Sequence, residues 1–175
     1  MAKKRKQRSD EELVAVSEHL LYEIQMLFGT AQALSTVGPS NGKDSRIWAT
    51  RNALLESFTI HARILLYFLY SAKPRPSDVI AEDFFDNGST WLQKRPAKSQ
   101  LLTTIHSRVG KEVAHLTYVR LDVTSEDKQW EFVNIANEIG GVLEKFLRLV
   151  PDARVSDAFR RFISQTVGTE GKAGA

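Results

Sequence analysis

The feature that most constrains the fold is a run of apolar residues at helical spacing within residues 99–122, SQLLTTIHSRVGKEVAHLTYVRLD. At 100° per residue, five apolar side chains of this run fall in one narrow arc: Leu102, Ile105, Val109, Val113 and Leu116. Such an arc is typical of a helix with one face in a hydrophobic core. The spacing therefore predicts one helix over 99–122. Gly110 lies inside it, where glycine costs about 1 kcal/mol relative to alanine.

Two long helices are predicted before this run. Ser9 and Glu12 have the spacing of a capping box, which predicts a helix from residue 10 to about residue 34. A loop over 38–42, GPSNG, ends it. Asp44 or Ser45 is a candidate cap for a second helix that reaches about residue 70. Its predicted core positions are Ile47, Leu54, Phe58, Leu65 and Leu69.

The second helix also carries charged and titratable groups close to its apolar arc. Arg51 and His61 fall in or beside that arc. A buried charge without a partner is costly, so we expect Arg51 to be paired.

The connection over residues 71–98 is long for a compact bundle, and long connections are often functional. Pro74 and Pro76 end the second helix. A short helix is predicted over 77–82, and the next aromatic residues are expected to anchor the connection in the core: Phe84, Phe85 and Trp91.

Two more helices are predicted after residue 122. Thr124 or Ser125 is a candidate cap for the first of them, and Pro151 follows its end. A last short helix is predicted over 156–167. No convincing strand or hairpin pattern is present. The predicted fold is all-α: a four-to-five-helix up-down bundle with a long, partly helical excursion between its second and third main helices.

The chain length of 175 residues predicts a single domain, over 9–167, between a disordered basic tail (1–8) and a disordered end (168–175). The net charge of +3 depends on the tail, which holds Lys3, Lys4, Arg5, Lys6 and Arg8. The chain has no cysteine, which excludes disulfides and thiolate chemistry. The start is not a secretory signal, and no apolar run is long enough to span a membrane. We expect a soluble cytoplasmic protein.

Arg108 and His115 are the first candidate functional pair. They are seven residues apart on the predicted helix, so both side chains point to the same side, next to the core arc. An imidazole moves protons near neutral pH, and a guanidinium binds phosphate oxygens. Together they suit cleavage of a phosphodiester by an internal 2′-hydroxyl without a metal. Tyr118 lies one turn further on as a helper. The alternative is a helix-edge histidine beside a surface arginine.

A second set of polar residues has either a packing role or a role in orienting His115. Its members are Glu56, His61, Arg63, Asp78, Glu82, Asp83 and Arg120. Arg120 falls on the core arc of the 99–122 helix, so we expect it to bond Glu56 or a carboxylate of the 77–85 segment and to hold the excursion against the bundle.

Metal and cofactor chemistry receive less support. Carboxylates and histidines are available, including His106, but the Glu-x-x-His pairs of di-iron bundles are missing. No phosphate-binding glycine loop, nucleophile elbow or dinucleotide fingerprint is present. We expect neither a metal nor a cofactor.

At Arg108-Val-Gly-Lys-Glu-Val-Ala-His115 the sequence resembles the HEPN superfamily of small helical bundles, whose mark is an arginine, four to six residues and a histidine on a late helix. Three pieces also resemble uncharacterised bacterial proteins: residues 55–63, 78–84 and 114–120. The resemblance spans about residues 50–147. Val109, after the arginine, departs from the polar residue common in active members.

The resemblance implies a homodimer with a composite cleft in which the arginine and histidine of both chains meet. It also implies metal-independent RNA cleavage in a toxin–antitoxin or phage-defence system, with a cognate antitoxin or nucleotidyltransferase as partner. Two hypotheses follow. The chain is a HEPN-like ribonuclease or RNA-binding protein, or it is a non-catalytic helical interaction protein, such as an antitoxin or scaffold. Val109 and the mildly acidic body favour the second.

Overall fold

The computed structural model describes residues 5–37, 44–86, 90–109, 118–121 and 130–167, and these residues contain helices and no strand. The all-α helical bundle predicted from the sequence is confirmed. The α-helices are α1 (Asp10–Thr36), α2 (Ser45–Tyr70), α3 (Thr90–Lys94), α4 (Gln100–Arg108), α5 (Phe132–Leu149) and α6 (Asp157–Val167). The short 3-10 helices are η1 (Ala81–Phe84), η3 (Tyr118–Leu121) and η4 (Asp152–Arg154).

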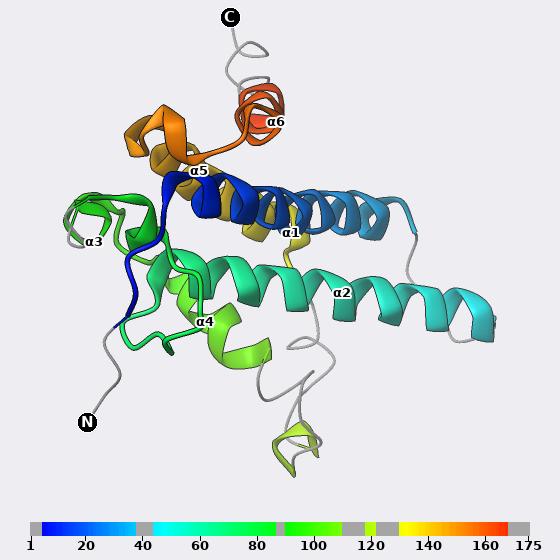
Figure 1. Cartoon of the computed structure of the whole chain (residues 1–175). Coiled ribbons are helices and arrows are strands. Elements are labelled where there is room, and N and C mark those ends of the chain that lie inside the picture. The colour runs from blue at the N-terminus through cyan, green and yellow to red at the C-terminus, as the bar shows by residue number, and fades with distance from the viewer. Residues whose placement is uncertain (1–4, 38–43, 87–89, 110–117, 122–129, 168–175) are drawn as a thin grey trace, which may run out of the picture.

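An antiparallel hairpin of α1 and α2 forms the long axis of the fold (Figure 1). Both helices begin at the predicted caps. Ser9 and Glu12 form the capping box, and the Asp44 carboxylate accepts from the amides of Arg46 and Ile47. In the view of Figure 1, α4 lies below α2 while α5 passes behind α1, and α5 contacts α1, α2, α4 and α6. The core is therefore enclosed by α1, α2, α4 and α5.

The centre of the core is a cluster of aromatic rings around Phe146 of α5. Four rings meet Phe146 edge-on at centroid distances of 5.4–5.8 Å. They belong to Phe68 of α2, to Phe84 of η1, to Phe85, the residue after η1, and to Trp91 of α3. Phe84, Trp91 and Phe146 are fully buried. The Trp91 indole also donates to the Leu69 carbonyl over 2.8 Å. The predicted anchoring of the excursion by its aromatic residues is confirmed.

The helix predicted over 99–122 is correct at its start and wrong at its end. Within α4, Leu102 and Ile105 are buried, as the periodicity predicts. Residues 110–117 lie outside the described residues. Where the description resumes, Tyr118 begins a 3-10 turn, and it is 90% exposed. A helix in a protein depends mainly on tertiary packing, and the apolar side chains of Tyr118 and Leu121 are exposed, so they contribute no packing that would stabilise an α-helix.

The helix after residue 122 starts later than predicted. The candidate caps Thr124 and Ser125 lie outside the described residues, and α5 begins at Phe132. Glu131 has φ −81° and ψ 64°, and the Phe132 amide donates to the Trp130 carbonyl. These are the features of an inverse γ-turn, which interrupts an α-helix at this point.

Two details in the first half of the chain also differ from the sequence prediction. Ile47, predicted in the core, is 48% exposed, because the first turn of α2 extends past the end of α1 (Figure 1). The short helix predicted over 77–82 is instead the 3-10 helix at 81–84. Arg51 does have the expected partners, which are the carbonyls of Leu34 and Val37 near the end of α1.

By length and composition, α2 is apolar enough to cross a membrane, but 44% of that stretch is buried inside the protein. Leu65, Leu66 and Leu69 have no exposed surface, as in the central helix of a soluble bundle. The apolar run at the end of α2 is thus used for the core.

We expect Phe146→Ala to destabilise the protein by about 3–5 kcal/mol, since it removes the ring that all four edge-on neighbours share. Urea unfolding measures the change. Leu92→Ala is the control, because Leu92 is 52% exposed and its truncation should change stability by less than about 0.5 kcal/mol. A loss below about 1 kcal/mol for Phe146→Ala would contradict the central position given to this ring.

Candidate functional site

Arg108, the last residue of α4, lies half-buried at the edge of the core. Its guanidinium carbon is 4.4 Å from the centre of the Trp130 ring, which is a cation–π contact. The next side chain, Val109, is only 1% exposed. Arg108 is therefore held in a fixed place beside the core while part of its side chain reaches solvent, as its spacing predicts.

Of the other two predicted catalytic residues, the structure describes only Tyr118. His115 lies outside the described residues. Tyr118 lies at the start of η3 and is 90% exposed, so its hydroxyl is open to solvent. Arg108 and Tyr118 are thus on two separate helical segments rather than on one.

His61, from the predicted polar set, pairs with a carboxylate on α1. Its Nδ1 lies 2.6 Å from Glu23 Oε2, and its ring meets the Tyr22 ring edge-on at 5.8 Å. Sequence reasoning did not name Glu23 as the partner. Its position does carry a signal, because Glu23 is three residues after Leu20 and four before Leu27, both buried, so it lies beside the core face of α1.

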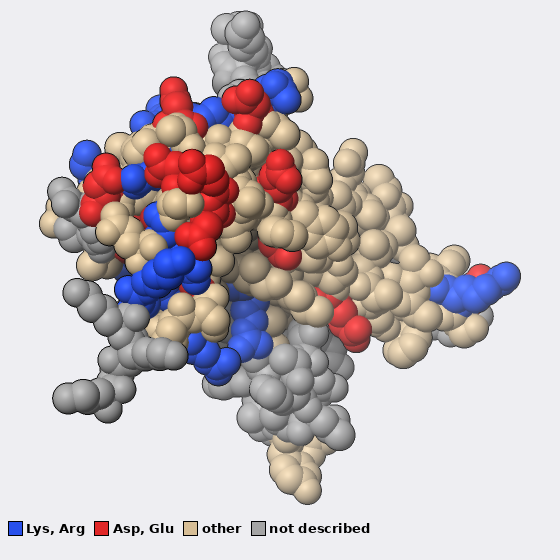
Figure 2. All heavy atoms as spheres, in the orientation of Figure 1, with Lys and Arg blue, Asp and Glu red and all other residues tan. Residues whose placement is uncertain are grey.

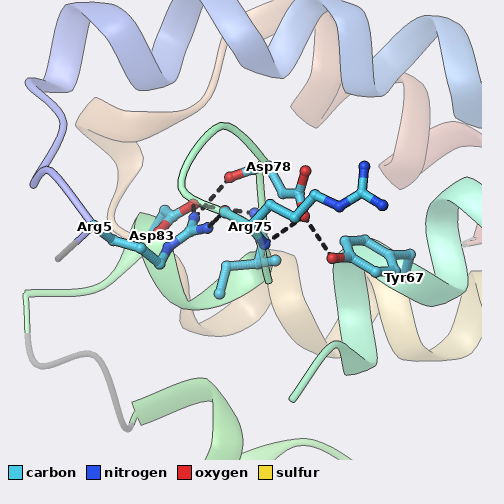
Figure 3. A network of polar contacts seen from close by, with 6 residues as sticks. Arg5, Tyr67, Arg75, Asp78 and Asp83 are labelled. Carbon is cyan, nitrogen blue, oxygen red and sulfur yellow. Dashed lines mark hydrogen bonds and ion pairs between the residues drawn. The ribbon is translucent and has the colours of Figure 1, made fainter. Parts of the chain in front are cut away.

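A polar network fixes the segment that follows α2 (Figure 3). Arg5 donates to the carbonyl oxygens of Arg75 (2.5 Å) and Asp78 (2.7 Å) and to Asp83 Oδ2 (2.5 Å). Arg5 was expected in a disordered tail, and its contacts correct that expectation at residue 5, because a guanidinium with several acceptors in reach orders the chain that carries it. Residues 1–4 lie outside the described residues.

Asp78 is held from α2 and from its own loop. Its Oδ2 accepts from the Tyr67 hydroxyl over 2.5 Å and from the Arg75 amide over 2.6 Å. The Tyr67 hydrogen bond, and then the Arg75 amide, hold the pKa of Asp78 below its ordinary value. Asp78 is therefore a carboxylate with its charge already stabilised.

Arg120 was expected to hold the excursion by bonding one of these carboxylates. Its side chain lies outside the part of the chain that the structure describes. Its candidate partner Glu56 is exposed on α2, whereas Asp83 is bonded to Arg5. The cation seen in the predicted contact with the excursion is thus Arg5, from the opposite end of the sequence.

Two adjoining hollows of about 390 Å³ each lie along α1, and we call them together the α1–α2 groove. They share Val16, His19, Asp78 and Val79. The first hollow is also lined by Leu20, Glu23, Arg63, Ile64, Tyr67 and Phe68, and the second by Arg8, Glu12, Leu13, Ala15 and Asp83. The groove thus brings together Arg63, Asp78 and Asp83 of the predicted polar set. His61 does not line it but is bonded to Glu23, which does. Glu56 does not line it.

A second cluster, which sequence reasoning did not assemble, surrounds Tyr70 at the end of α2. Arg95 and Lys98 lie over the Tyr70 ring, with their charged ends 5.2 and 4.9 Å from its centre. The Tyr70 hydroxyl and Glu82 Oε2 are buried, and neither has a hydrogen-bond partner within the described residues. The cluster combines α2, η1 and the segment between α3 and α4, so no sequence spacing indicates it.

Burial changes the acidity of these groups. It raises the pKa of Glu82 and of Tyr70 and lowers that of Lys98, because a low-dielectric environment disfavours the charged form. The neighbouring Arg95 partly offsets the shifts of Glu82 and Tyr70 and adds to that of Lys98.

Among the described residues, no three histidine, aspartate or glutamate side chains come together in a way that could hold a metal ion. A scan against protein-family models finds no match to this chain, and searches of curated proteins and of solved structures find none.

We expect Glu82→Gln to stabilise the protein at about pH 7.5 and to have no stabilising effect at about pH 3.5. Burial raises the folded-state pKa of Glu82 above its ordinary value of 4.5. Stability is therefore lost as the pH rises through the ordinary value, and the loss is complete above the folded-state pKa. Glutamine does not ionise, so it removes that loss.

Urea unfolding at the two pH values measures this difference, with Glu18→Gln, an exposed carboxylate on α1, as the control. Destabilisation by Glu82→Gln at about pH 7.5, or an effect independent of pH, would show that the Glu82 carboxylate is stabilised where it lies.

Proposed function

We propose that this chain is a HEPN-like, metal-independent endoribonuclease or RNA-binding protein of the cytoplasm. The observation that carries the proposal is the position of Arg108, whose guanidinium is held over the Trp130 ring at the edge of the core. An arginine fixed in this way is preorganised to bind a phosphate and still reaches solvent. His115, the other half of the motif, lies outside the described residues.

In the proposed reaction, His115 removes the proton from an RNA 2′-hydroxyl, and the oxygen attacks the adjacent phosphorus. Arg108 stabilises the negative charge that builds up on the phosphate oxygens. The bond to the 5′-oxygen breaks, and that oxygen takes up a proton from an acid, with Tyr118 as a candidate donor. The products are a 2′,3′-cyclic phosphate and a free 5′-hydroxyl.

The resemblance that motivates this function also suggests the assembly. Two copies of the chain would face each other so that both Arg108 and His115 pairs line one cleft. A toxin–antitoxin or phage-defence setting follows from the same resemblance, with an antitoxin or nucleotidyltransferase protein as partner.

A second candidate function is that of a non-catalytic interaction protein, and one surface favours it. The twelve residues of α1 from Gln25 to Thr36 include no charged side chain, and Trp48 at the start of α2 is 57% exposed. Figure 2 shows the corresponding end of the hairpin as a broad uncharged surface, with charged residues gathered at its tip. A surface of this kind suits contact with another protein.

The two functions are separated by incubating the purified protein with mixed RNA in EDTA. We expect cleavage by the wild type, and His115→Ala should reduce its rate by about 10²–10⁴-fold, the usual contribution of a general acid or base. Arg108→Lys should also lose activity, because lysine keeps the charge but not the planar, bidentate geometry.

Arg161→Ala is the matched control, since Arg161 is an exposed arginine on α6. No cleavage by the wild type, or equal cleavage by His115→Ala, would contradict the ribonuclease proposal. Expression in a growing host gives an independent readout. Growth arrest by the wild type and not by His115→Ala would exclude the purely non-catalytic function.

A further inference from the structure

Lys98, in the segment between α3 and α4, has a positive neighbour and no counterion. Its Nζ lies 4.9 Å from the centre of the Tyr70 ring, and the guanidinium carbon of Arg95 lies 5.2 Å from the same centre. Two cations thus share one aromatic ring. Within the described residues, no carboxylate forms an ion pair with Lys98. The half-buried amine therefore meets a like charge that nothing beside it balances.

The two carboxylates of this cluster do not offset that effect. Glu138 of α5 accepts a hydrogen bond from the Ser99 hydroxyl. Glu82 of η1 is itself half-buried, and its own pKa is raised by burial. Burial, and then the charge of Arg95, lower the pKa of Lys98, and neither carboxylate works against them.

The Tyr70 ring attracts a cation, but only one of its two neighbours can give up its charge. A guanidinium stays protonated in proteins, whereas a lysine shifts its pKa readily when it is removed from water. Lys98 also directly precedes Ser99, which caps α4, and the positive end of a helix dipole disfavours a cation there. Partial burial, Arg95 and the start of α4 all favour the uncharged amine of Lys98.

An uncharged amine is the nucleophilic form of lysine, and partial desolvation next to another cation is one way in which proteins obtain it. We propose that Lys98 is an acyl-acceptor site, which takes an acyl group from a thioester or an acyl phosphate. The Nζ lone pair attacks the acyl carbon, and an amide bond forms. The bond from that carbon to the thiolate sulfur or the phosphate oxygen breaks, and the thiolate or phosphate leaves. The amine proton passes to solvent, and one of the two like charges beside Tyr70 is removed.

This reaction is independent of the proposed ribonuclease activity. Lys98 precedes α4, whereas Arg108 is the last residue of that helix. The acyl group is detected on Lys98 itself, and RNA cleavage is measured separately, so failure of one proposal leaves the other standing.

Site-resolved mass spectrometry of the full chain, after brief incubation with acetyl phosphate or with acetyl-coenzyme A, tests the proposal. Lys94, at the end of α3, is the control within the chain, because it is exposed and accessibility alone would favour it over Lys98. We expect Lys98 to be acetylated at least about threefold faster than Lys94 and to reach its half-maximal rate at a lower pH. In urea that unfolds the chain, the two lysines should react at the same rate.

Two variants complete the experiment. Arg95→Gln removes the neighbouring charge, so it should slow acetylation of Lys98 and move its pH profile upwards while Lys94 is unchanged. Arg46→Gln, at an exposed arginine in the first turn of α2, should behave like the wild type. Reaction with only one of the two donors would support the proposal and identify the donor class. The proposal is wrong if Lys98 reacts no faster than Lys94 with either donor, if the two lysines share one pH profile, or if Arg95→Gln leaves the Lys98 rate unchanged.

Discussion

The packing of four aromatic rings around Phe146 is the interaction on which the rest of this fold depends. The rings come from α2, from η1 and the residue after it, and from α3, so one side chain of α5 joins the hairpin to the excursion. Edge-on ring pairs each contribute about 0.5–1.5 kcal/mol beyond the burial of their surface. Several such pairs on one centre explain how a connection with so little helix of its own becomes part of the core.

Polar contacts around this aromatic cluster also hold the excursion in place. Arg5 binds the excursion from the N-terminal side. Arg154 of η4 binds it from the other side, through Asp86 and the Phe84 carbonyl, and also pairs with Asp10 at the start of α1. These cations and backbone amides thus bond the carboxylates of the excursion and hold it against the helices.

Much of the fold was predictable because its signals are local. The capping box at Ser9, the cap at Asp44 and the helical periodicity up to Val109 all depend on residues a few positions apart. The errors arise where a non-local effect decides. The turn at Glu131 interrupts a helical pattern, and Ile47 has the right periodicity but lies past the end of its neighbouring helix.

The candidate sites were predictable only in part, for the same reason. The spacing within one helix was enough to find Arg108 at the edge of the core. The pairing of His61 with Glu23 joins residues 38 positions apart, and that of Arg5 with Asp83 joins residues 78 apart. No periodicity reports such contacts. Sequence reasoning recognised that a cation should hold the excursion and named Arg120, whose side chain lies outside the part of the chain that the structure describes. It did not name Arg5, because the basic tail carried no pattern that would distinguish this residue.

The central claim is that the excursion belongs to the core and unfolds with it. Native-state hydrogen exchange tests this claim at the amides of Asp83, Phe85 and Arg95, which donate to the carbonyls of Ile80, Glu82 and Trp91. The account predicts that these amides exchange only with a free energy close to that of global unfolding, like the amides of the central turns of α2. Exchange at the rate of an unprotected loop, with α2 still protected, would contradict it.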